Sequence, residues 1–119
     1  MANKKTMTDG GLVTWVIDTD AQINLGEAAE GVVGSWTLQV IGAGTYSIVL
    51  RKKLRRSSVA DASAPTTYYI NHATGASVNA GTAITGAGLF SVPSNACDVI
   101  IDVDWTSGAC SVECVPLLG

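Results

Sequence analysis

The sequence predicts an all-β protein, an antiparallel β-sandwich or jelly roll of about eight short strands. Three observations support this fold class. Apolar and polar side chains alternate with a period of two over several stretches. Turn-forming residues separate these stretches at spacings of about 8–12 residues. No stretch shows the spacing of apolar residues that is typical of an amphipathic helix.

The chain of 119 residues is long enough for one domain with a hydrophobic core. Residues 1–11 are polar and end in two glycines, so we expect a flexible N-terminal arm followed by a single domain over residues 12–119. Charged residues make up only 14% of the chain, against roughly 25% in an ordinary soluble domain. Such a low share is expected of a protein that covers part of its surface with partners.

Turn residues bound each expected strand. The clearest strand has Trp36, Leu38 and Val40 on one face and polar residues on the other. The polar stretch 57–65 should be an exposed loop, and the tail 116–119 begins with a proline that should not continue a central strand. In chain order, we expect strands at 12–17, 21–25, 35–41, 46–50, 66–70 and 89–92, a weakly patterned strand and loop at 77–85, and one helical turn within 26–34.

Residues 97–115 carry the strongest alternation and predict a β-hairpin with a two-residue turn at Ser107-Gly108. In this register the apolar rows of the two arms face each other, and a shift by one position would oppose polar and apolar residues. The same register places Asp102 beside Glu113. The predicted core of the whole domain comprises Trp15, Trp36, Trp105, Val40, Ile48, Leu50, Phe90, Val99, Ile101 and Val103.

The three cysteines predict free thiols. Cys110 and Cys114 lie four positions apart on one expected strand, too far for a disulfide at about 3.3 Å per residue. The expected register does not bring Cys97 near either of them. Three reduced, mostly buried thiols indicate synthesis inside a cell.

Charge is unevenly distributed along the chain. Five of the seven basic residues form one run, and three interpretations stay open for it: a solvated strand end, a docking strip for an acidic protein surface or a phosphate contact. The net charge of −3 and the lack of interleaved aromatic residues argue against nucleic acid. The basic residues of this run are Arg51, Lys52, Lys53, Arg55 and Arg56.

An acidic face is expected opposite the apolar row of the last strands. Its carboxylates could hold a calcium ion, or could contact the basic run of a neighbouring copy. The expected acidic residues are Asp98, Asp102, Asp104 and Glu113. Lys4 and Lys5 in the arm and Leu117 and Leu118 in the tail are further candidate contact residues.

No catalytic motif is recognisable in the chain. His72 is the only histidine, and it lies in a turn-like segment far from any nucleophile motif. The glycine pairs Gly42/Gly44 and Gly86/Gly88 are interpreted as turns that permit unusual φ, not as phosphate loops, because no helix follows them. We therefore expect no enzymatic activity, no cofactor and no metal. Neither a secretion signal nor a membrane span is recognisable.

Three stretches resemble a family of small β-sandwich proteins encoded by tailed bacteriophages. They are residues 34–40 (GSWTLQV), residues 69–92 (YINHATG and TAITGAGLFSV) and residues 99–112 (VIIDVDWTSGACSV). Members of this family are virion components, commonly head decoration (cement) proteins or related tail domains. The chain departs from the family pattern in having the basic run in its middle and aspartates in its last strands.

The resemblance implies a non-enzymatic structural protein that binds and stabilises the assembled head. Its expected partners are the major capsid protein and copies of itself, most simply as a homotrimer, with no membrane or nucleic acid. It would be made in the bacterial cytoplasm and reside on the capsid surface of the virion. Two alternatives stay open: a tail, neck or fibre component, and a carbohydrate- or cell-surface-binding module, for which Tyr68 and Tyr69 could offer exposed rings.

Overall fold

The computed structural model describes the chain at residues 4–7, 12–27 and 33–118. Over these residues the chain forms ten strands and two short 3₁₀ helices. The elements are β1 (Lys4–Met7), β2 (Val13–Val16), β3 (Ala21–Asn24), η1 (Leu25–Glu27), β4 (Val33–Ile41), β5 (Thr45–Leu54), η2 (Asp61–Ser63), β6 (Tyr69–Asn71), β7 (Ala76–Val78), β8 (Gly88–Pro93), β9 (Cys97–Ser107) and β10 (Ser111–Leu118).

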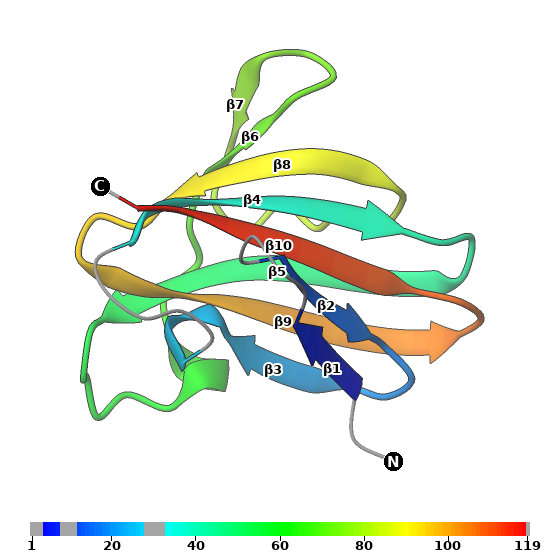
Figure 1. Ribbon diagram of the computed structural model, residues 1–119, viewed down its shortest axis with the longest axis horizontal. Helices are drawn as coiled ribbons and strands as arrows, with labels where there is room; N and C mark the ends of the chain where they lie inside the picture. Colours follow the sequence, from blue (N-terminus) through cyan, green and yellow to red (C-terminus); the bar gives the residue numbers. More distant parts are fainter. Residues whose placement is uncertain (1–3, 8–11, 28–32, 119) are drawn as a thin grey trace.

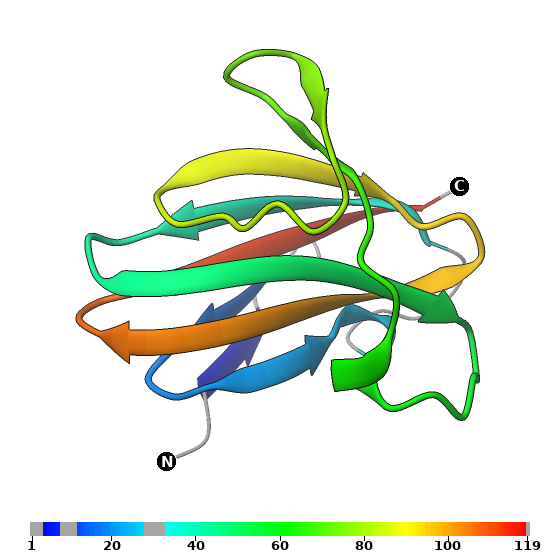
Figure 2. The ribbon, with the colours of Figure 1, turned by 180° about the vertical axis from the view of Figure 1, so that it is seen from behind.

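The strands form two sheets that face each other, so the predicted β-sandwich is confirmed. The larger sheet has the order β1-β2-β10-β4-β8-β6-β7, and the smaller sheet has the order β3-β9-β5. All of these pairings are antiparallel. The larger sheet lies in front in Figure 1, and Figure 2 shows the smaller sheet from the other side.

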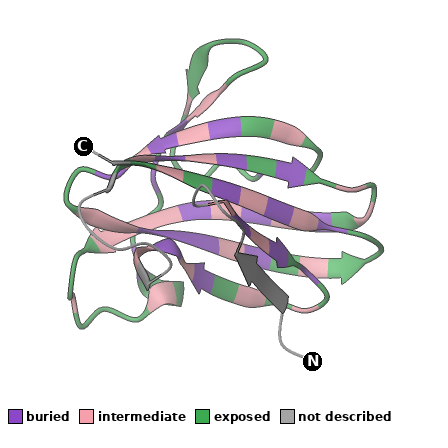
Figure 3. Cartoon of the chain, viewed as in Figure 1, coloured by how far each residue is buried: buried purple, intermediate pink, exposed green. Residues whose placement is uncertain are grey.

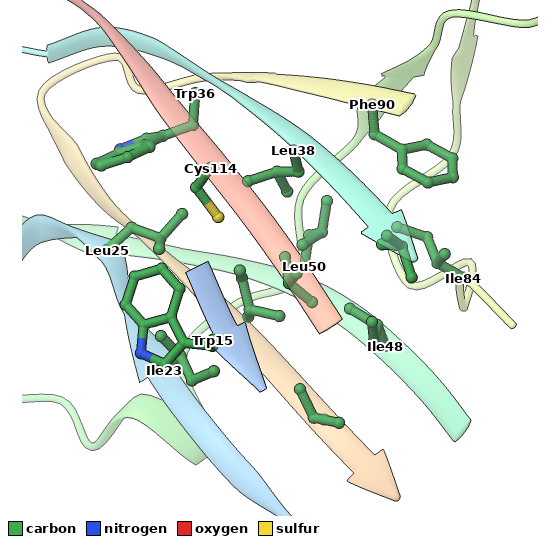
Figure 4. Packing of buried hydrophobic residues seen from close by; sticks show 14 of the residues in the cluster. Trp15, Ile23, Leu25, Trp36, Leu38, Ile48, Leu50, Ile84, Phe90 and Cys114 are labelled. Carbon is green, nitrogen blue, oxygen red and sulfur yellow. The ribbon is translucent and has the colours of Figure 1, made fainter. Parts of the chain in front are cut away.

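The core lies between the two sheets and receives the apolar row of each long strand, as the alternating buried segments in Figure 3 show. Trp36 and Leu38 of β4 point from the larger sheet toward Leu25 and Leu50 on the other side (Figure 4). Every predicted core residue except Trp105 is buried. Trp105 packs against the margin of the core and keeps its indole N–H within 3.1 Å of a loop carbonyl oxygen, which only a rim position allows.

The predicted hairpin over 97–115 is wrong in its pairing. β9 pairs with β3 and β5, whereas β10 pairs with β2 and β4 in the other sheet. The link between them crosses from sheet to sheet, and the Gly44 N–H donates to the Ala109 carbonyl at 2.9 Å. The two apolar rows meet across the core instead of side by side, and alternation is satisfied equally well by either arrangement. Asp102 and Glu113 consequently lie in different sheets.

At both ends of the described chain, residues that the sequence does not predict to be in strands belong to the larger sheet. Pro116 lies inside β10, because from Val115 onward β10 pairs with β4 alone and a proline is tolerated where one side of a strand is open. Lys4–Met7, expected to be part of a flexible arm, form β1 beside β2. The rest of the arm and most of the expected helical turn, residues 28–32, lie outside the described residues.

Two irregular segments cover the outer edge of β5. Ile48 and Ile84 exchange backbone hydrogen bonds of 2.9 and 2.7 Å, and Lys52 N–H donates to the Pro65 carbonyl at 2.9 Å. The segment expected at 77–85 as weakly patterned strand and loop begins in β7, which ends at Val78, and continues as a loop whose Ile84 pairs with Ile48 of β5. Covering an edge removes a site for uncontrolled strand pairing.

The β4–β5 turn packs backbone against backbone on the link between β9 and β10. A Cβ on Gly42, whose φ is +123°, would lie 2.4 Å from the carbonyl oxygen of Ala109. The expectation that all four turn glycines permit unusual φ holds only for Gly42. Gly44 and Gly88 are needed for space, since a Cβ would lie 2.6 Å from a backbone oxygen and 2.7 Å from an aromatic ring, respectively. Gly86 has open space around it.

Candidate interaction surfaces

The outer face of the smaller sheet holds five of the eleven charged residues predicted for an interface, namely Arg51, Lys53, Asp98, Asp102 and Asp104. Arg51 Nε donates to Asp102 Oδ2 at 2.9 Å across the β5–β9 pair. Lys53 Nζ lies 2.7 Å from Asp61 Oδ1. Two bases of the run are therefore paired with acids of the same chain, and Asp102, expected to contact another copy, is one of those acids.

The loop between β5 and β6 is exposed along most of residues 57–65, as the sequence predicts, and it folds over one end of this face. Arg51 Nη1 donates to the Ala64 carbonyl at 2.7 Å, and Lys53 Nζ donates to the Val59 carbonyl at 2.7 Å. Figure 2 shows η2 of this loop against the end of β3. Beneath the loop Ile100 is fully buried, which explains an isoleucine among the aspartates of β9. The loop covers the end of the face that carries Arg51 and Lys53, whereas Asp104 farther along β9 is exposed.

The five bases of the run do not form one continuous strip. Arg51 and Lys53 point to the covered outer face, and Lys52 lies between them on the opposite face of β5. Arg55 and Arg56 follow the strand and are exposed, and neither forms an ion pair with an acid in the described ranges. Lys52, Arg55 and Arg56 are thus separated from the compensated bases.

These three bases lie beside two exposed apolar residues, and we call Lys52, Leu54, Arg55, Arg56 and Tyr68 the basic corner. Lys52 Nζ donates to Asn95 Oδ1 at 3.1 Å and lies 5.4 Å from the centre of the Tyr68 ring. Burial lowers the pKa of Lys52, and the nearby Cys97 acts in the opposite direction. The ammonium is therefore held in one place by partners from two other segments.

Two tight turns meet at the basic corner. The turns at 54–57 and 94–97 are each closed by a backbone hydrogen bond of 2.9 Å, and Arg55 N–H donates to the Ala96 carbonyl at 3.3 Å. Arg56 has φ of 64° and Ala96 has φ of 61°. This left-handed region suits glycine and is costly for other residues. The corner is thus a place where the backbone is strained in two neighbouring turns.

The outer face of the larger sheet is very different, and we call it the open face. Among the side chains of β2, β4, β8 and β10, Glu113 is the only charged one that points outward, and it accepts a long hydrogen bond of 3.5 Å from Thr14. Between the aliphatic residues lie serine, threonine and glutamine side chains. Of the eight large apolar residues that are exposed in the described part of the chain, five lie here: Val16, Ile41, Leu89, Val115 and Leu117.

Sequence reasoning found only part of the open face. Glu113 and Leu117 were candidate contacts, and Leu118 is in β10, but its side chain, like those of Lys4 and Lys5 in β1, is outside the described residues. The remaining aliphatic residues were missed. Each follows or precedes a core residue directly, as in Cys114-Val115, and such apolar pairs in an alternating strand are the signal that its outer face is also apolar.

Other candidate chemistries find little support in the described part of the chain. His72 Nε2 lies 2.5 Å from Ser91 Oγ on the surface, and no carboxylate there hydrogen-bonds to the imidazole to orient it. Across the described ranges, no three or more His, Cys, Asp or Glu side chains are grouped to hold a metal ion. Tyr69, considered as an exposed ring, is buried edge-on against Phe90. No described helix is long and apolar enough to span a membrane.

The three cysteines are free, as predicted, and differ in accessibility. Burial raises the pKa of Cys110 and of Cys114, and the Glu113 carboxylate adds to the effect at Cys114. Because the thiolate is the reactive form, we expect iodoacetamide to modify Cys97 alone in the folded protein and all three cysteines after denaturation. Peptide mass spectrometry reads this directly, and rapid modification of Cys114 in the folded protein would contradict it.

The sandwich therefore has one outer face that is partly covered by the β5–β6 loop and carries two ion pairs, one open face with exposed aliphatic residues, and a basic corner where β5 ends. Comparison with protein-family models, curated proteins and solved structures finds no match to this chain.

Proposed function

We propose that this chain is a non-enzymatic structural protein of a tailed-bacteriophage virion, which decorates and stabilises the assembled head. The observation that carries the proposal is the open face, where β2, β4, β8 and β10 present five exposed aliphatic side chains and one charged side chain, Glu113. Apolar patches of this kind mark protein contact sites. The resemblance of residues 34–40, 82–92 and 99–112 to phage virion sandwiches supports the same role.

In the proposed mechanism the open face packs on the major capsid protein at the capsid surface, with copies of the chain beside one another, most simply as a homotrimer. Burying the aliphatic side chains would contribute roughly 25 cal/mol per Å² of apolar surface. A protein that binds the assembled shell but not free subunits stabilises the shell by mass action. Many weak contacts repeated over the lattice would then resist disassembly.

The first test is whether the genes beside this one encode a major capsid protein, and the second is co-sedimentation of the purified protein with expanded empty heads assembled from that capsid protein. We expect saturable binding and a higher temperature of head disruption. No binding to heads would overturn the proposal, and binding to purified tails instead would replace head decoration with the tail alternative.

A matched pair of variants assigns the binding to the open face. Val115→Asp places a charge on the open face, where the valine is 40% exposed, and Val59→Asp makes the same change at 42% exposure on the loop over the smaller sheet. Burying an unpaired carboxylate is costly, so only Val115→Asp should lose head binding. Equal binding by both variants, with circular dichroism spectra unchanged, would exclude the open face.

A further inference from the structure

We infer that the basic corner is a second interaction surface, which binds an acidic protein segment that also contains apolar side chains. The corner lies at the end of β5 in the smaller sheet, whereas the open face belongs to the larger sheet. The inference does not depend on the proposed virion role, because it concerns only the chemistry of the partner.

The first argument is uncompensated charge. Arg51 and Lys53 are paired with Asp102 and Asp61, but the three bases of the corner form no ion pair in the described part of the chain. The Lys52 ammonium and the Arg55 backbone both bond to the 94–97 turn, so these bases lie at one end of the smaller sheet on a protein whose net charge is −3. Complementary charge steers association and selects partners, so a carboxylate-rich segment fits this site.

The second argument is preorganisation. Lys52 is held by Asn95 and the Tyr68 ring, and the turn at 54–57 fixes the backbone that carries Arg55 and Arg56. Arg56 has φ of 64°, a conformation that glycine would adopt at lower cost. Backbone strain of this kind collects at binding sites. A fixed set of donors loses less conformational entropy when it binds.

The third argument concerns the apolar side chains between the bases. Leu54 is 68% exposed and Tyr68 is 42% exposed. A segment with carboxylates alone would leave both uncovered, whereas one that mixes glutamate with leucine or phenylalanine covers them. A nucleic acid backbone offers no apolar groups for Leu54, and three bases would neutralise few phosphates. The corner therefore favours an acidic, partly apolar peptide over nucleic acid.

Fluorescence anisotropy with a labelled peptide that alternates glutamate with leucine tests the inference on the full chain. We expect this peptide to bind at least about tenfold more tightly than the same peptide with glutamine in place of glutamate, with an affinity that falls as salt is raised. A single-stranded oligothymidylate of equal charge should bind more weakly than the acidic peptide.

Two charge-reversal variants with the same change in net charge locate the site. R55E/R56E should weaken peptide binding at least about tenfold, since each lost attraction is replaced by a repulsion. K4E/K5E, whose residues lie in β1 of the other sheet, should bind as the unmodified chain does. Urea denaturation midpoints confirm that both variants fold. The inference is overturned by undetectable peptide binding, by equal binding of R55E/R56E, or by tighter binding of the oligothymidylate.

Discussion

Replacing Leu50 with alanine should lower the free energy of unfolding by about 2–5 kcal/mol. Leu50 lies in the middle of β5, is 1% exposed and faces the β4 side chains across the core (Figure 4). Truncation to alanine loses the favourable free energy of burying the leucine side chain. It also leaves a cavity between the two sheets, which cannot collapse onto each other to fill it. Because domains of this size are stable by only about 5–15 kcal/mol, the loss is a large fraction of the total.

Equilibrium urea denaturation measures this loss, and Leu117→Ala is the matched control. Leu117 is 66% exposed on the open face of β10, so the same change in chemistry should alter the free energy of unfolding by less than about 0.5 kcal/mol. Similar losses in the two variants would contradict the assignment of β5 to the inner layer.

Gly42→Ala should be destabilising by about 2–6 kcal/mol, from backbone strain together with overpacking. The glycine has φ of +123°, and the new Cβ would lie 2.4 Å from the Ala109 carbonyl oxygen. Neither partner can yield easily, because both belong to backbone segments that connect the two sheets.

Two other glycines separate the strain from the steric conflict. Gly75 has φ of +69° with no atom within 4 Å of a new Cβ, so Gly75→Ala should show the strain alone. Gly86 has an ordinary φ and equally open surroundings, so Gly86→Ala should be close to neutral. Thermal unfolding of the three variants should rank Gly42→Ala as the least stable and Gly86→Ala as the most stable. Any other order would contradict the packing of the β4–β5 turn.

Sequence alternation predicted which residues enter the core but not which strands pair. The inward rows Val99, Ile101 and Val103 of β9 and Val112 and Cys114 of β10 are buried as expected. Alternation shows which face of a strand is apolar. Two apolar faces can be buried together either when their strands pair in one sheet or when they pack against each other across the core. The contact that decides between them, between Ala109 and the distant Gly44, has no local signal.

The interaction surfaces show the same division. The basic run is visible in the sequence, but which of its bases form ion pairs is not. Asp102, the partner of Arg51, is distant in sequence, and Asp61, the partner of Lys53, lies on a loop that folds back onto the sheet. The open face was missed because an exposed valine such as Val115 reads like a core residue until the pairing of its strand is known.

The position of β10 has a consequence for how the molecule assembles during synthesis. β10 comes last among the described strands, yet it lies between β2 and β4 in the middle of the larger sheet, where Glu113 meets Thr14, 99 positions earlier. The larger sheet therefore cannot form as one sheet until β10 has emerged from the ribosome. Such sequence-distant pairing is characteristic of domains that fold in milliseconds to seconds rather than microseconds.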